Sequence, residues 1–185
     1  MTVSRCKWAQ NIKDTEYLEY HDKEWGTPVR DDRSLFELLT LEGAMAGLSW
    51  LTILKKRNHY RREYKNFDIE KVSHMTQKEL EQILVRGDVV KHGGKIRSVV
   101  VNACACKDLI EEYGSIAKYF EDMLDGEDVS DLSITTAPVS EVAKSISKNL
   151  KKRGFSFVGP TTVQSFLQAT GFFQCHDEEC FRYKQ

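Results

Sequence analysis

Hydrophobic residues recur three and four positions apart over most of the chain, the spacing at which side chains share one face of a helix. This spacing predicts helices over 34–46, 49–64, 76–86, 94–113, 115–124, 139–152 and 161–170. Ser34 and Thr76 each stand three residues before a glutamate, which is the spacing of a capping box, and Thr161 or Thr162 is expected to cap the last helix. Since the chain has three prolines and few alternating valine or threonine runs, we predict an all-α fold.

Residues 1–30 lack this periodicity and are expected to be irregular. They nevertheless carry a high density of aromatic, histidine and cysteine side chains: Cys6, Trp8, Tyr17, Tyr20, His21 and Trp25. Disordered tails are poor in aromatic residues, so we expect this segment to pack against the helical body.

Composition places the chain among ordinary globular proteins. It has 185 residues, of which 41% are hydrophobic and 30% charged, and this length favours a single domain. Its apolar runs fall short of a membrane span, and residues 1–14 have no apolar signal core. We therefore expect no membrane partner and a cytoplasmic location.

Glu42 stands at an unexpected place in the helix predicted over 34–46. It continues the face formed by Leu35, Leu38 and Leu39, and a carboxylate on an apolar face is costly unless something offsets its desolvation. Four of the next five residues are glycine or alanine, so another body can approach the backbone closely there. Two interpretations stay open on spacing alone: a carboxylate that emerges at a helix end, or an acidic group built into a site.

The net charge of −1 by itself indicates no particular partner, but the charges are unevenly distributed. Basic residues gather over 55–65, 91–97 and 151–153, and acidic residues over 121–131 and 177–179. Such segregation permits a basic face for phosphates on a nearly neutral protein. Each basic cluster, taken alone, is explained more simply as charged side chains at a solvent-exposed helix end.

Residues 84–96 have the pattern of a helix-hairpin-helix motif: a helix, a short turn with a glycine and two valines, and a second helix. Lys91, Gly93 and Lys95 stand at the start of the second helix, where backbone amides and lysines can meet a phosphate. Asp88 occupies the place of the usual glycine, and an aspartate facing phosphates weakens the expected grip on DNA.

The five cysteines are an odd number, which argues against a disulfide framework. His176 and Cys180 are one helical turn apart and can bind the same ion, and Cys6 and His21 could supply two further ligands. Two thiolates and two imidazoles suit tetrahedral zinc, and four protein ligands make such a site structural. Cys175, next to His176, is an alternative ligand.

Several of these residues occur together in motifs that resemble one family. The motifs are Cys6-Lys7-Trp8, Tyr17-x-x-Tyr20-His21-Asp22-x-Glu24-Trp25-Gly26, Leu41-Glu42-Gly43-x-x-Ala46-Gly47-Leu48-Ser49-Trp50, Leu150-Lys-Lys-Arg-Gly-Phe-x-Phe-Val-Gly159 and His176-x-x-x-Cys180. From Cys6 to Cys180 the chain is similar to the DNA-3-methyladenine glycosylase I family of the helix-hairpin-helix superfamily. The combination is specific, although no single motif is.

The resemblance implies a base-excision repair enzyme that removes 3-methyladenine from alkylated double-stranded DNA. It would hydrolyse the N-glycosidic bond without cutting the backbone. We expect a monomer with no obligate protein partner. We expect one unit over 1–185, with a helical core over about 31–170 and with segments 1–30 and 171–185 joined by a structural zinc ion. The implied zinc ligands are Cys6, His21, His176 and Cys180.

The resemblance also assigns a base pocket, formed by Glu42, Tyr17, Tyr20, Trp50 and Trp8. Methylation at N3 makes the adenine cationic, so aromatic faces attract it and Glu42 can accept hydrogen bonds from its edge. Glu42 as a general base toward water is the second interpretation of its role. Leu48, next to Gly47, is a candidate wedge into the gap left by the extruded base.

Departures from the family pattern concern DNA contacts more than the fold. Met45 replaces a usual glutamine, and a tyrosine common in the last helix is missing around 164–166. Two alternatives therefore stay open: a catalytically silent DNA-binding or lesion-sensing module on the same scaffold, and a small zinc protein unrelated to DNA.

Overall fold

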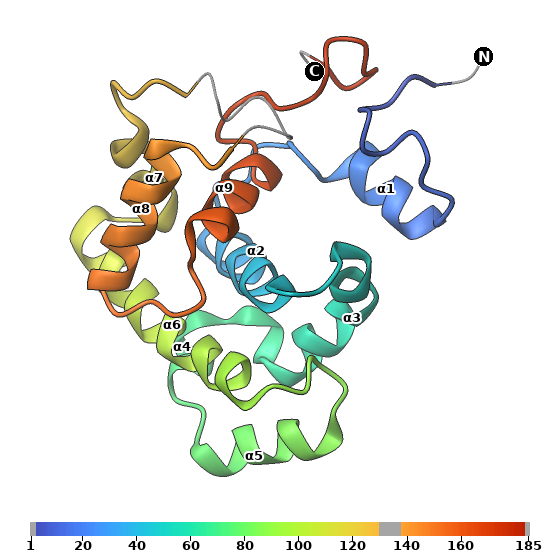
Figure 1. The fold of residues 1–185 in the computed structure, drawn as a ribbon. Helices are drawn as coiled ribbons and strands as arrows, with labels where there is room; N and C mark the ends of the chain where they lie inside the picture. Colours follow the sequence, from blue (N-terminus) through green and yellow to red (C-terminus); the bar gives the residue numbers. More distant parts are fainter. Residues whose placement is uncertain (1–2, 130–137, 184–185) are drawn as a thin grey trace.

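The computed structural model describes residues 3–129 and 138–183, and the regular elements in these ranges are all helical (Figure 1). They are α1 (Thr15–Lys23), α2 (Asp32–Met45), α3 (Trp50–Glu63), the short 3-10 helix η1 (Lys65–Phe67), α4 (Ile69–Ser73), α5 (Gln77–Arg86), α6 (Gly93–Tyr113), α7 (Ile116–Leu124), α8 (Glu141–Lys152) and α9 (Pro160–Ala169). Within these ranges no helix is long and apolar enough to cross a membrane. The predicted all-α class is confirmed.

Helix α2 runs through the middle of the molecule (Figure 1). It packs against α3, α6, α7 and α9, so every residue from Leu35 to Ala44 is buried, polar ones included. This position explains why an acidic side chain near its C-terminal end has no route to solvent along the helix surface. The carboxyl group of Glu42 is buried because the whole helix is.

The two ends of the described chain lie beside each other (Figure 1). The amide of Phe181 donates to the Ser4 carbonyl at 2.9 Å, and the amide of Val29 donates to the Thr170 carbonyl at 3.0 Å. The N-terminal segment therefore packs on the body, as its aromatic content predicts. It also contains a helix, α1, which the hydrophobic pattern did not predict because its residues are mostly polar.

Helix starts test the capping predictions directly. The Thr76 capping box is present as predicted. The Ser34 box is wrong: Asp31 caps α2, and Glu37 instead forms ion pairs with Arg57 and Arg61 of α3. The expected threonine cap of the last helix is also wrong, because Gly159 is the N-cap of α9, and Pro160 at the first helical position has no amide that needs a partner.

Candidate active site

A pocket of about 310 Å³ opens where α1, α2, α3 and α9 meet. Its lining consists of Trp8, Tyr17, Tyr20, Trp25, Glu42, Met45, Trp50, Ser165 and Gln168. The structure therefore brings together all five residues that the sequence assigned to a base pocket. They come from the N-terminal segment, from α1, from the end of α2 and from the first residue of α3.

The acidic group of this pocket is nearly inaccessible, since Glu42 is 3% exposed. Its Oε2 atom has no hydrogen-bond partner among the described residues. Burial raises the pKa of Glu42 to about 8, because the charged form loses its hydration there. The carboxyl group is therefore mostly neutral at pH 7 while the pocket is empty.

Two indole groups of the pocket share this lack of partners. Within the described residues, neither the Trp8 nor the Trp50 Nε1–H, both buried, meets an acceptor. Buried polar atoms in native proteins almost always have a partner, so three such atoms around one cavity point to a polar ligand or to ordered water.

Aromatic rings form a continuous wall around the acid. The ring centroids of Tyr20 and Trp50 are 5.1 Å apart, those of Trp8 and Tyr17 5.6 Å, and those of Tyr17 and Tyr20 6.4 Å. Burial, and secondarily the nearby Glu42 carboxylate, raises the pKa of both tyrosines above its usual value. The phenols therefore stay neutral, and the wall suits a flat, electron-poor ring.

Sequence reasoning missed three polar or aromatic members of the lining. Trp25 was noted only as an aromatic residue, and Ser165 and Gln168 were not considered for the site. The last two lie three residues apart on α9, hence on one helix face, and Gln168 is buried. The sequence carries no signal for them, because positions 161, 164, 165 and 168 are all polar and predict a solvated helix face.

The residues assigned to DNA binding fall into two neighbouring structures. Gly47 and Leu48 belong to the exposed turn between α2 and α3, where Leu48 is 43% exposed and Gly47 has a φ of +78°. Lys91 and Gly93 lie at the start of α6, with the Lys91 side chain exposed. Lys95 differs from them, since its ammonium group donates to two backbone carbonyls at the end of α2.

The turn between α5 and α6 contains Asp88, expected to oppose phosphates. Its carboxylate pairs with Arg62 of α3, and its carbonyl accepts from Lys56 at 2.8 Å. The negative charge is thus partly compensated within the protein. Gly87, with a φ of +72°, ends α5 in the left-handed conformation that glycine tolerates best.

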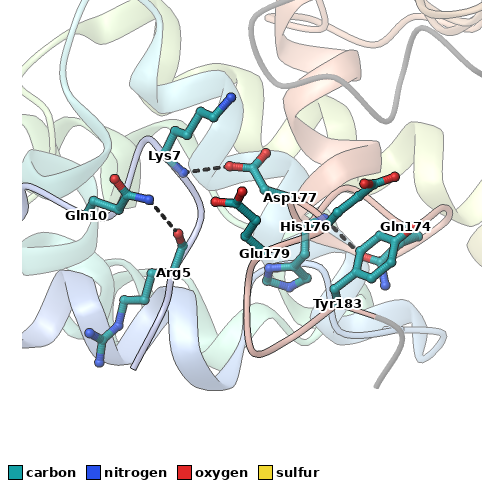
Figure 2. A pocket seen from close by; sticks show the side chains of 9 residues that line it. Arg5, Lys7, Gln10, Gln174, His176, Asp177, Glu179 and Tyr183 are labelled. Atoms are coloured by element: carbon teal, nitrogen blue, oxygen red, sulfur yellow. Dashed lines mark hydrogen bonds between the residues drawn. The ribbon is translucent and has the colours of Figure 1, made fainter. Parts of the chain in front are cut away.

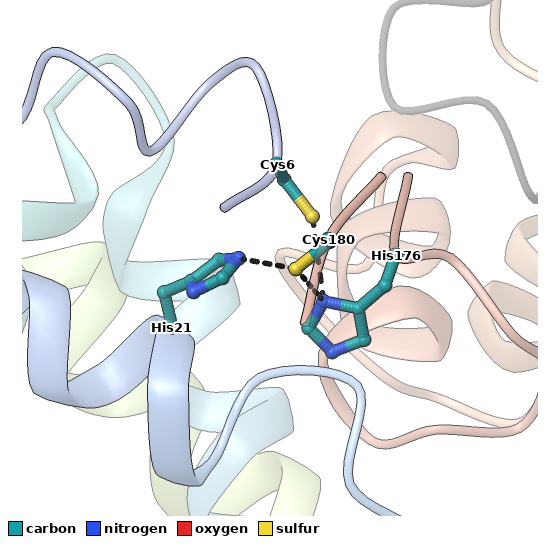
Figure 3. Close-up of side chains that lie close together, drawn as sticks. All are labelled: Cys6, His21, His176 and Cys180. Atoms are coloured by element: carbon teal, nitrogen blue, oxygen red, sulfur yellow. Dashed lines mark hydrogen bonds between the residues drawn. The ribbon is translucent and has the colours of Figure 1, made fainter. Parts of the chain in front are cut away.

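Cys6, His21, His176 and Cys180 form a buried cluster that could hold a metal ion (Figure 3). The Sγ atom of Cys6 is 3.3 Å from Nδ1 of His176, and that of Cys180 is 3.6 Å from Nδ1 of His176 and 3.7 Å from Nε2 of His21. In tetrahedral zinc sites a sulfur and a nitrogen ligand are about 3.6 Å apart, from the usual bond lengths. The observed separations fit that geometry.

The groups behind the two histidines also fit a metal site. The Nδ1–H of His21 donates to Asp22 at 2.8 Å, and Asp22 is held by Arg5 through two contacts of 2.8 and 2.7 Å. The Nε2–H of His176 donates to the Trp25 carbonyl at 3.0 Å. Each ring thereby presents its other nitrogen to the centre, the arrangement that carboxylate and carbonyl partners give metal-binding histidines.

Cys175, the alternative ligand, lies outside the cluster. Its buried thiol donates to the Gln168 carbonyl at 3.4 Å. The structure thus separates the two adjacent candidates, 175 and 176, into different surroundings.

A larger cavity, of about 580 Å³, lies beside the cluster at the junction of the terminal segments (Figure 2). Its walls are mainly charged. The Lys7 amide donates across the junction to the Asp177 carboxylate at 2.6 Å, and within the N-terminal segment the Gln10 side chain donates to the Arg5 carbonyl at 3.2 Å. This cavity is the space between the N-terminal and C-terminal segments, and its lining, within the described residues, lacks an aromatic wall like that of the smaller pocket.

Comparison with known proteins gives one family. Residues 8–183 match the sequence model of the methyladenine glycosylase family. The DNA-3-methyladenine glycosylase of Haemophilus influenzae is 38% identical over 96% of this chain and 97% of its own length. The DNA-3-methyladenine glycosylase 1 of Escherichia coli is 36% identical over 98% of this chain and 97% of its own length.

A solved structure shares the fold. The 3-methyladenine DNA glycosylase I of Staphylococcus aureus, studied for its recognition of 3-methyladenine, superposes with a TM-score of 0.87. It is 36% identical, with 96% of both chains covered. The similarity therefore extends over nearly the full length of both chains.

Proposed function

This chain belongs to the methyladenine glycosylase family, and we propose on that premise that it excises 3-methyladenine from alkylated DNA in base excision repair. The observation that carries the proposal is the buried carboxyl group of Glu42, with an unpartnered oxygen, inside a wall of aromatic rings. A damaged base must leave the duplex to reach such a pocket, which costs a few kcal/mol.

Charge separates the damaged base from a normal one. The 3-methyladenine nucleotide is a cation, and a cation over an aromatic face gains about 0.5–2 kcal/mol. Glu42 accepts hydrogen bonds from the base edge, and the cation converts its neutral carboxyl group to the carboxylate, because an opposite charge favours the ionised form. Since about 1.4 kcal/mol is tenfold, two or three such contacts discriminate against neutral adenine by orders of magnitude.

Hydrolysis follows from the charge of the leaving group. Water forms a bond to C1′ of the sugar, the bond from C1′ to N9 breaks, and its electron pair neutralises the base. One proton leaves the attacking water, and the Glu42 carboxylate is the acceptor in the pocket. Recognition of the cation is the main role of Glu42, because a cationic leaving group departs readily and the reaction then needs little general-base catalysis.

The DNA contacts are proposed for two surfaces. The α5–α6 pair acts as a helix-hairpin-helix, with Lys91 and the backbone amide at Gly93 facing a phosphate of the duplex. Leu48, carried on the exposed turn beside Gly47, fills the gap that the extruded base leaves.

We assign zinc to the four-residue cluster, in a structural role. When bound, it supplies a cross-link between the N-terminal and C-terminal segments. The cluster also borders the pocket: the ring centroids of Trp8 and His21 are 5.1 Å apart, and those of Trp25 and His176 are 4.8 Å apart. Tyr20 directly precedes His21. The residues of the cluster thus hold the aromatic half of the pocket in place, and the whole chain acts as one unit.

Base release from methylated DNA, measured by mass spectrometry, tests the function. We expect the wild type to release 3-methyladenine above a no-enzyme control, and Glu42→Gln to release far less while its thermal unfolding stays cooperative. Undiminished release by Glu42→Gln would remove the acid from its assigned role. Absence of release by the wild type, with DNA binding retained, would instead identify a silent DNA-binding module.

A further inference from the structure

Lys91 and Lys95 were both predicted to face a phosphate. In the described structure the ammonium group of Lys95 instead donates hydrogen bonds to backbone carbonyls. Its Nζ atom donates to the Ala44 carbonyl at 2.9 Å and to the Ala46 carbonyl at 2.6 Å. These two carbonyls lie at the C-terminal end of α2, where the helix dipole favours a positive charge. Partial burial lowers the pKa of Lys95, consistent with an ammonium group drawn away from solvent.

Apart from Lys95, the hydrogen bonds of the turn are local in sequence: the Leu48 amide donates to the Met45 carbonyl at 2.6 Å, and the Ser49 hydroxyl caps α3. Residues 46–49 are exposed, although they join the buried Glu42 region to the buried Trp50. A Cβ added to Gly47 would meet nothing within 4 Å. The hydrogen bond of the Ala46 amide to the Gly43 carbonyl is long, at 3.4 Å. The carbonyls gripped by Lys95 thus belong to the segment that presents Leu48.

A second contact closes the same junction between α2 and α6. Phe157 has a left-handed backbone with a φ of +56°, which is rare for a residue with a side chain. A Cβ added to Gly43 would lie 3.0 Å from the Phe157 carbonyl oxygen, and one added to Gly94 would lie 3.5 Å from its ring. The buried Asn102 side chain fixes the loop by accepting from the Ser156 amide at 2.8 Å and donating to the Ser156 carbonyl at 2.9 Å.

We propose that Lys95 is a positioning residue, which fastens the α5–α6 hairpin to the 46–49 turn so that Leu48 enters the duplex at a fixed distance from the phosphates held by the hairpin. The proposal rests on the proposed function. It differs from a phosphate contact, because the Lys95 ammonium group stays on the carbonyls of Ala44 and Ala46 in the DNA complex.

Three lysine-to-methionine variants test it, since methionine keeps the side chain long and removes its charge. Lys95→Met removes the fastening. Lys91→Met removes the exposed lysine of the hairpin, which we assign to a phosphate. Lys107→Met is the matched control on the same helix, where the lysine pairs with Glu70 at 2.7 Å on the surface.

Each variant is measured in three ways: affinity for free 3-methyladenine, single-turnover excision from a duplex at saturating enzyme, and salt dependence of binding to a duplex with an abasic analogue. For Lys95→Met we expect free-base affinity within twofold of wild type. Its excision rate falls about tenfold or more, since small misplacements cost up to about a hundredfold. The slope of the logarithm of its DNA-binding constant against the logarithm of salt concentration is unchanged. In Lys91→Met the magnitude of that slope falls by about 0.9. Lys107→Met matches wild type throughout.

Two results would overturn the proposal. A salt slope lowered by about 0.9 in Lys95→Met, with the saturated excision rate retained, would make Lys95 a phosphate contact. A loss of free-base affinity equal to the loss of excision would make it a support of the fold only. Release of 3-methyladenine by the wild type shows that the proposed function holds. Either result then counts only against the role of Lys95.

Discussion

The raised pKa of Glu42 makes a quantitative prediction about how a cationic base binds. In the empty pocket burial holds the pKa of this group at about 8. A bound cation about 4 Å away stabilises the carboxylate by about 4 kcal/mol at an effective dielectric constant of about 20, equivalent to about three pKa units. The pKa of Glu42 in the complex is therefore expected near 5.

Binding then releases a proton, so the affinity rises with pH between these two values. We expect an increase of about forty- to fiftyfold from pH 6 to pH 8, and about 0.9 proton released per ligand at pH 7. The neighbouring phenols of Tyr17 and Tyr20 stay protonated over this range, because their pKa values are raised.

The assay needs a ligand whose charge does not change with pH. The 3,9-dimethyladeninium ion is a permanent cation without a sugar to lose, and quenching of tryptophan fluorescence reports its binding. Calorimetry in two buffers of different ionisation enthalpy gives the number of protons released. Glu42→Gln is the control and should bind weakly with no dependence on pH. A wild-type affinity that changes less than threefold from pH 6 to pH 8 would refute the reasoning.

Three further predictions concern the supports of the site. Asp22→Asn weakens the hydrogen bond behind His21 and should lower zinc affinity about tenfold to a hundredfold, measured by competition with a chelator. Asp88→Asn removes a negative charge from the hairpin and should tighten duplex binding, and an affinity below that of wild type in low salt would count against the hairpin as the DNA contact. Thr76→Ala removes a helix cap and should lower the free energy of unfolding by about 1 kcal/mol, seen as a lower denaturant midpoint at unchanged slope.

Local patterns predicted the helical body well because apolar residues with helical spacing mark buried helix faces. The same logic failed for α1, which is largely polar and is held by contacts distant in sequence. Glu37 shows a second kind of failure. Its position three residues after Ser34 predicts a cap, but its carboxylate pairs with Arg57 and Arg61, which a neighbouring helix supplies.

The candidate site was predictable where a residue type conflicts with its surroundings. Glu42 stands on a leucine face, and the structure shows it buried without a partner for Oε2 among the described residues. Ser165 carried no such conflict, so only the packing of α9 against the pocket reveals it. Lys95 is the reverse case: its charge suggested a phosphate, and only the three-dimensional structure shows the carbonyls that it meets.

The meeting of the two chain ends has a consequence for synthesis on the ribosome. Helices α2 to α9 can assemble from residues that lie between these segments, but Trp8 and Tyr20 lie beside a cluster whose other members, His176 and Cys180, are translated after α9. Contacts of such long sequence separation form after local ones. A nascent chain should therefore acquire its helical core first, and become able to hold a damaged base only once residues 176–180 have left the exit tunnel.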